Sequence, residues 1–148
     1  MRIYLTLTAE DRAALESART ALPLTPGRAA WAVTAQGRTA FPGEDEEDLE
    51  YEALQDAVHV AYSTGSPRER ALVIAADVPD TTIVEAEDGG AFGVRLTAEA
   101  SARIASFHVT ELDAAAAEAD DTDPALLWFD AAEPAAALAF LDATAAAG

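Results

Sequence analysis

The feature that most constrains the fold of this 148-residue chain is an apolar run that starts at Ala71 and stops abruptly at Asp80. Its Leu, Val and Ile residues do not alternate with polar residues, so a strand formed here must be covered on both faces. Pro79 has no N–H for a ladder bond and Asp80 favours a turn, which ends the strand. We therefore expect Ala71–Val78 to be the central strand of the fold.

The rest of the chain predicts an α/β or α+β fold, with a single mixed sheet of about six strands and helices packed on it, because strands and helices alternate before a hairpin intervenes. The other strand patterns are Arg2–Leu7, Ala29–Thr34, Thr82–Glu87, Ala91–Leu96, Ile104–Val109 and Leu126–Phe129. Helices are expected from Thr8 to about Thr20, from Glu44 to about Tyr62, from Thr97 or Ala98 to about Arg103, and after Glu133. A single globular domain over residues 1–148 fits the length.

Several local expectations follow from side-chain spacing. In the helix that opens at Glu44, the residues at helical spacing form the buried stripe: Tyr51, Leu54, Val58 and Ala61. Residues 35–41 fit either a hairpin turn or a short helix. Residues 112–125 are rich in Ala and acids, and we expect an exposed acidic helix or loop that could be mobile. Trp31 and Trp128 are expected to anchor the core.

The net charge excludes some functions. The chain carries 27 acidic residues and nine basic residues, for a net charge of −18. All nine basic residues are Arg. Such a charge opposes direct binding to nucleic acid or to an anionic membrane, because phosphate contacts need Lys and Arg. The chain has no Cys, no apolar run of transmembrane length and no signal-peptide pattern. We therefore expect a cytoplasmic protein.

The motifs of well-known active sites are missing from the sequence. There is no Gly-x-Gly-x-x-Gly, no Walker motif and no Gly-x-Ser-x-Gly elbow. The two histidines, His59 and His108, lie far apart and outside any zinc motif. The sequence therefore predicts no cofactor, no metal and no catalytic set.

Three residues are candidates for a ligand site at strand ends. Asp77 ends the central strand, where ligands gather in open α/β sheets. His108 lies on the same strand face as Ser106 and Thr110, and Glu111 follows the end of that strand. A histidine with nearby carboxylates can act as a base or bind a cation. The alternatives are that Asp77 only forms a turn and that His108 only faces solvent.

A dense acidic run at the start of the long helix is the candidate for partner binding: Glu44, Asp45, Glu46, Glu47, Asp48 and Glu50. Acids in a first helical turn are stabilised by the helix dipole, so a solvated helix start explains them as well. A binding face for a basic protein is the second interpretation, and a mimic of nucleic acid is the third.

The order of several segments resembles a family of small acidic actinobacterial proteins known only as a domain of unknown function. The segments that carry the resemblance are Arg2–Leu5, Glu46–Leu54, Val73–Pro79, His108–Val109 and Leu127–Phe129. The family pattern has Tyr where this chain has Phe129. The resemblance implies no known activity, so no catalytic residue is carried over from it.

Two functions from different classes remain open. The first is a non-enzymatic cytoplasmic module that binds a basic partner or self-associates through its acidic surface. The second is a small-ligand or metal-binding protein, or an enzyme, with its site around Asp77, His108 and Glu111.

The charge leads to a first prediction. Self-repulsion among the excess acids destabilises the folded state, and salt screens it. Thermal unfolding followed by circular dichroism should show a melting temperature that rises from low salt to physiological salt. A flat or falling trend would contradict this.

Overall fold

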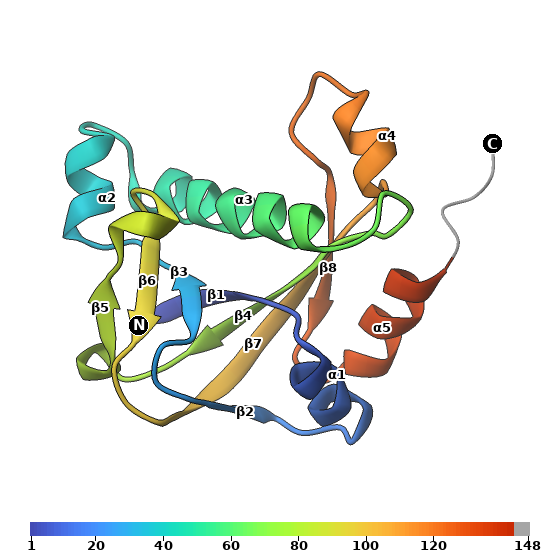
Figure 1. The fold of residues 1–148 in the computed structure, drawn as a ribbon, viewed down its shortest axis with the longest axis horizontal. Helices are drawn as coiled ribbons and strands as arrows, with labels where there is room; N and C mark the ends of the chain where they lie inside the picture. Colours follow the sequence, from blue (N-terminus) through green and yellow to red (C-terminus); the bar gives the residue numbers. More distant parts are fainter. Residues whose placement is uncertain (144–148) are drawn as a thin grey trace.

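The computed structural model describes residues 1–143, which form one sheet with helices on both faces (Figure 1). The strands are β1 (Arg2–Thr6), β2 (Ala21–Leu24), β3 (Ala29–Trp31), β4 (Leu72–Asp77), β5 (Ile83–Glu85), β6 (Gly93–Leu96), β7 (Ala100–Thr110) and β8 (Leu126–Asp130). The α-helices are α1 (Ala9–Glu16), α2 (Ala35–Ala40), α3 (Glu46–Thr64), α4 (Ala114–Glu118) and α5 (Pro134–Asp142). Two 3-10 turns, η1 (Asp80–Thr82) and η2 (Glu87–Gly89), flank β5.

The predicted fold class is confirmed in its α+β form, with eight strands in the described residues. The strand order is β2-β7-β4-β1-β3-β6-β5, and the long β7 pairs with β2 along its first half and with β8 along its second. Every pairing is antiparallel, so the sheet is not mixed as the sequence pattern had suggested. A continuous apolar run reports only that both faces are covered, so it does not distinguish parallel from antiparallel neighbours.

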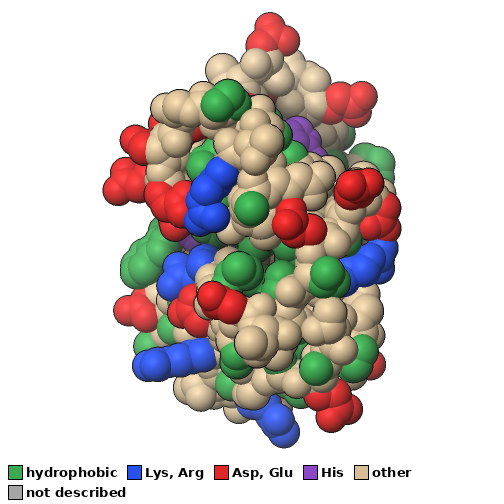
Figure 2. Space-filling model, turned by 90° about the vertical axis from the view of Figure 1, so that its left-hand side faces the viewer, with side chains coloured by type: hydrophobic (Ala, Val, Ile, Leu, Met, Phe, Trp, Pro, Cys, Tyr) green, Lys and Arg blue, Asp and Glu red, His purple; other side chains and the backbone are tan. Residues whose placement is uncertain are grey.

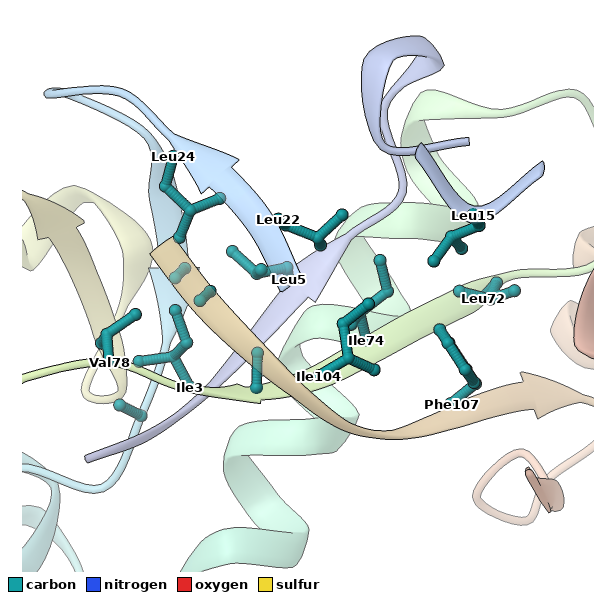
Figure 3. Close-up of a cluster of buried hydrophobic side chains, with 14 of the residues drawn as sticks. Ile3, Leu5, Leu15, Leu22, Leu24, Leu72, Ile74, Val78, Ile104 and Phe107 are labelled. Atoms are coloured by element: carbon teal, nitrogen blue, oxygen red, sulfur yellow. The ribbon is translucent and has the colours of Figure 1, made fainter. Parts of the chain in front are cut away.

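The central position predicted for β4 is confirmed. It pairs with β1 on one edge and with β7 on the other. Leu72, Ile74 and Ala76 point into one hydrophobic cluster, together with residues of β1, β2 and β7 (Figure 3). Val73 and Ala75 point into a second cluster on the opposite face. All five side chains are at most 2% exposed.

Helices cover both faces of the sheet. α3 lies across the face of the second cluster (Figure 1), where Ala53 and Ala57 are fully buried. α1 and α5 pack on the other face through Leu15, Ala137 and Leu138. The small alanines of α3 and α5 bring each helix close to the sheet.

The predicted buried stripe of α3 is half right. Leu54 and Val58 are buried, but Tyr51 is 43% exposed and Ala61 is partly exposed. The centre of the buried face runs through Ala53 and Ala57 instead, because helix packing selects small residues at the closest approach.

The limit of one predicted helix and the existence of another are wrong. α1 starts at the predicted Thr8 cap, whose side chain accepts from Asp11 N–H, but it ends at Glu16 and the chain returns as β2. The helix expected from Thr97 or Ala98 to Arg103 does not form. From Ala100 onward its residues are the first half of β7, where Ala102 lies opposite Leu22. The β7 segment is rich in alanine, whose helix propensity is overridden by pairing between β2 and β4. The segment after α1 becomes β2 because it pairs with β7.

Other local predictions fare better. The undecided segment 35–41 contains the helix α2. The hairpin is present as β5 and β6, with Ile83 opposite Leu96. Its loop turns at Gly90, whose φ of 87° is in the left-handed region. Most of residues 112–125 is exposed or partly exposed around the short α4, and the mobility of this segment stays a prediction.

Among the helices of the described residues, none has the length and apolar character needed to cross a membrane.

The burial of β4 generates a stability prediction. Ile74 is fully buried, so Ile74→Ala should lower the free energy of unfolding by about 2–5 kcal/mol through lost burial and a cavity. Val84 on β5 is 49% exposed, and Val84→Ala is the matched control that should cost less than about 0.5 kcal/mol. Urea denaturation measures both, and similar costs for the two variants would contradict the central role of β4.

Candidate functional site

The best candidate site is a depression of about 300 Å³ between the first half of α3 and the sheet, which we call the α3–β8 groove. Its lining residues come from β1, α3, β4, β7 and β8: Arg2, Tyr4, Glu47, Glu50, Tyr51, Leu54, Ala75, Ser106, His108 and Trp128. Segments distant in sequence therefore bring a histidine, a serine, two tyrosines and two carboxylates together.

A β-bulge in β7 decides what lies in the groove. Ser106 is paired with Ala75, but the next residue of β4, Ala76, is paired with Ile104. The extra residue, Ala105, shifts the alternation, so that Ile104 and Phe107 both point into the core below. The side chains of Ser106 and His108 remain on the opposite face of the sheet, under α3.

Ser106 and His108 form the polar floor of the groove. Ser106 Oγ lies 2.9 Å from His108 Nε2. Burial, with a smaller contribution from the positive charge of Arg2, lowers the pKa of His108 to about 4. The imidazole is therefore neutral at pH 7 and a weak base, and no carboxylate in the described residues hydrogen-bonds to it.

The wall formed by β1 is polar but electrically balanced. Arg2 Nε donates to Asp77 Oδ1 at 2.8 Å, and Arg2 Nη2 lies 3.3 Å from Asp77 Oδ2. This hydrogen bond lowers the pKa of Asp77. Burial, and then the negative charge of Glu50, raises the pKa of Tyr4 to about 12, so its hydroxyl stays protonated.

The rim of the groove is aromatic and acidic. Trp128 is 62% exposed and lies opposite His108 in the β7–β8 pairing. Tyr51 donates to Asp123 Oδ2 at 3.2 Å and keeps much of its ring exposed. Glu47 and Glu50 take part in none of the ion pairs found between residues 1 and 143.

The three predicted ligand residues are not brought to one place. His108 lies in the groove, and Asp77 borders it through its ion pair with Arg2. Glu111 lines a different depression, beside Arg70 and Asp123. No group of three or more His, Cys, Asp or Glu side chains in the described chain is arranged to hold a metal ion.

The acidic run divides into structural and free residues. Asp45 caps α3 by accepting from Asp48 N–H at 2.9 Å, and Glu46 pairs with Arg38 at 2.5 Å. Glu47 and Glu50 face the groove. The remaining members, Glu44 and Asp48, are exposed.

Sequence reasoning missed part of the groove. Trp31 is buried as predicted, but the prediction that Trp128 anchors the core is wrong. Its strand lies at an edge, and the alternation of side chains puts Phe129 toward α5 and leaves Trp128 on the open face. Arg2 and Tyr4 gave no signal, because their neighbours in the groove come from strands far along the chain.

Comparison with known proteins identifies a family but no activity. A family described as "Family of unknown function (DUF6912)" matches residues 1–144. No curated protein and no solved structure matches the chain. The function must therefore be argued from the groove itself.

The low pKa of His108 predicts a pH dependence of stability. The unfolded state takes up this proton near pH 6.5 and the folded state only near pH 4, so the stability from the neutral imidazole is lost between pH 6.5 and 4. His108→Gln should make the fall in unfolding free energy shallower in this window. Proton NMR of the His59→Gln protein, in which His108 is the only imidazole, should give a midpoint near 4. A midpoint near 6.5 would contradict the burial of the ring.

Proposed function

Because the chain belongs to the family of unknown function DUF6912, we propose a function from its geometry: a cytoplasmic interaction module whose α3–β8 groove binds a basic segment of a partner protein. The observation that carries this proposal is the exposed Trp128 beside Glu47 and Glu50 in one groove.

An exposed indole beside unpaired carboxylates suits a guanidinium or ammonium group. A cation over a Trp ring gains about 0.5–2 kcal/mol, depending on how far it is desolvated. The carboxylates of Glu47 and Glu50 can accept charge-assisted hydrogen bonds from the same cation. Tyr51, on the same rim, adds a second aromatic face.

The other groups of the groove leave its charge negative. Arg2 is neutralised by Asp77, while His108 and Tyr4 are both uncharged at pH 7. The charges of Glu47 and Glu50 therefore remain, which favours a cation over an anionic or neutral ligand.

The charge of the whole molecule supports the same partner. A net charge of −18 raises the association rate with a basic protein. Figure 2, which views the side of α2 and β5, shows acidic side chains spread over that face with arginines among them. Charge on this face is not gathered in one patch, so specificity is better supplied by the aromatic groove.

A second candidate function is ligand binding or catalysis around Asp77 and His108. The observation in its favour is the hydrogen bond between Ser106 and His108, because a nucleophilic serine needs a base within hydrogen-bond distance. The low basicity of His108 weighs against it. A thermal-shift screen with Mg²⁺, Mn²⁺, Ca²⁺ and Zn²⁺ would support a metal site by a shift that Asp77→Asn and His108→Gln abolish. If no metal ion gives such a shift, a metal site around Asp77 and His108 is contradicted.

The proposal predicts binding of a short arginine-rich peptide. Isothermal titration calorimetry at low salt should give a dissociation constant that rises about tenfold in Glu47→Gln/Glu50→Gln, the equivalent of about 1.4 kcal/mol. Trp128→Ala should weaken binding further through loss of the cation–π contact.

The matched control is Glu16→Gln/Glu99→Gln, which removes the same charge from exposed residues outside the groove. If this control weakens binding as much as the groove variant, the peptide responds to net charge alone and the proposed site is wrong.

A further inference from the structure

The strand that carries Trp128 has an unpaired edge. β8 pairs with β7 on one side and with no strand on the other, within the part of the chain that the structure describes. α5 packs against the face of the sheet here, with the Phe129 and Phe140 rings 6.2 Å apart, and does not replace the missing strand.

The hydrogen-bond register identifies which backbone groups face outward. Glu111 N–H donates to Ala125 C=O at 2.9 Å, so residues 111 and 125 form a hydrogen-bonded pair. By the alternation of antiparallel ladders, Leu127 and Phe129 are bonded to β7, whereas Leu126 and Trp128 direct their N–H and C=O groups away from it. By the same alternation the backbone of Asp130 also faces outward, but its N–H already donates a hydrogen bond to Glu133 Oε1 at 3.0 Å.

This edge lacks the usual protection against strand pairing. The outer strand β2 contains Pro23, and the outer strand β5 has only three residues and ends at Glu85. β8 begins Leu-Leu-Trp-Phe, with no Pro, charge or bulge before Asp130. Among residues 1–143, no hydrogen bond satisfies the outward backbone groups of Leu126 and Trp128.

We propose that β8 receives the basic segment as an added β-strand. This inference rests on the proposed function of the groove and specifies how the partner is held. Main-chain hydrogen bonds to Leu126 and Trp128 supply affinity, and alternate side chains supply specificity.

The geometry also defines the sequence of the segment. A residue opposite Trp128 points to the same face and reaches the groove with Glu47 and Glu50, so it is Arg or Lys. Its two neighbours point to the other face, toward Phe129 and Phe140, so they are apolar. The partner segment therefore alternates apolar and basic residues.

Charge favours a basic segment over a second copy of the chain as the occupant of the β8 edge. Two β8 edges paired with each other would bring together two chains of charge −18, each with an acidic groove next to the joint. Like charges at close range oppose that pairing, while a basic segment is attracted.

N-methylated peptides test strand addition without altering the protein. The probe is an acetylated and amidated Val-Arg-Val-Arg-Val-Arg-Val peptide, measured by calorimetry. Two variants carry N-methyl groups on all arginines or on all internal valines. Because alternate N–H groups of a strand point to the same edge, one variant should lose at least about tenfold in affinity and the other should stay within about threefold.

A variant of the edge gives a second readout. Leu126→Pro removes one outward N–H and no bond to β7, so it should weaken binding, whereas Leu126→Ala keeps the N–H and should bind more tightly than the Pro variant. If Leu126→Pro fails to fold, the comparison of the two methylated peptides tests strand addition by itself.

The failures are distinguishable. Equal binding of both methylated peptides, with sensitivity to Glu47→Gln/Glu50→Gln, would overturn strand addition and leave the proposed function standing. No binding of any peptide would overturn both. A dimer in sedimentation velocity that Leu126→Pro converts to monomer would overturn the basic segment as occupant in favour of a second copy.

Discussion

The structure depends on the enclosure of β4. This strand is paired on both edges and buried on both faces, so every other layer is placed relative to it. Each face supports one hydrophobic cluster, and the helices divide between them: α3 on one side, α1 and α5 on the other. The burial of apolar side chains such as Ile74 and Val73 drives this arrangement, and the backbone hydrogen bonds of β4 are satisfied within the sheet.

The groove follows from how α3 meets the sheet. Ala53 and Ala57 bring the helix into close contact over β4, but the sheet continues beyond the helix to β7 and β8. The bulge at Ala105 then presents Ser106 and His108 in the region that α3 does not fully cover. A polar, half-buried floor and an exposed aromatic rim are the result of packing a narrow helix on a wide sheet.

The floor of the groove carries no net charge at pH 7. A buried histidine that resists protonation and a tyrosine that resists ionisation hold the floor neutral. Arg2 and Asp77 neutralise each other at its border. The carboxylates of Glu47 and Glu50 on α3 form no ion pair within residues 1–143, and they line the same groove as the exposed Trp128. Acidic charge and aromatic surface therefore border one groove, and the strand that carries Trp128 pairs only with β7 within these residues.

The sequence by itself determined what depends on local pattern: the buried central strand from the unbroken apolar run, the start of α1 at Thr8, and the acidic beginning of α3. Only the tertiary structure decided what depends on partners distant in the chain. Alanine-rich residues became strand in β7 because β2 and β4 flank them, Trp128 became exposed because β8 lies at an edge, and Arg2 reached His108 across the sheet. Local propensity is set by a few neighbouring residues, whereas strand order and the shift of one bulge are set by packing of the whole domain.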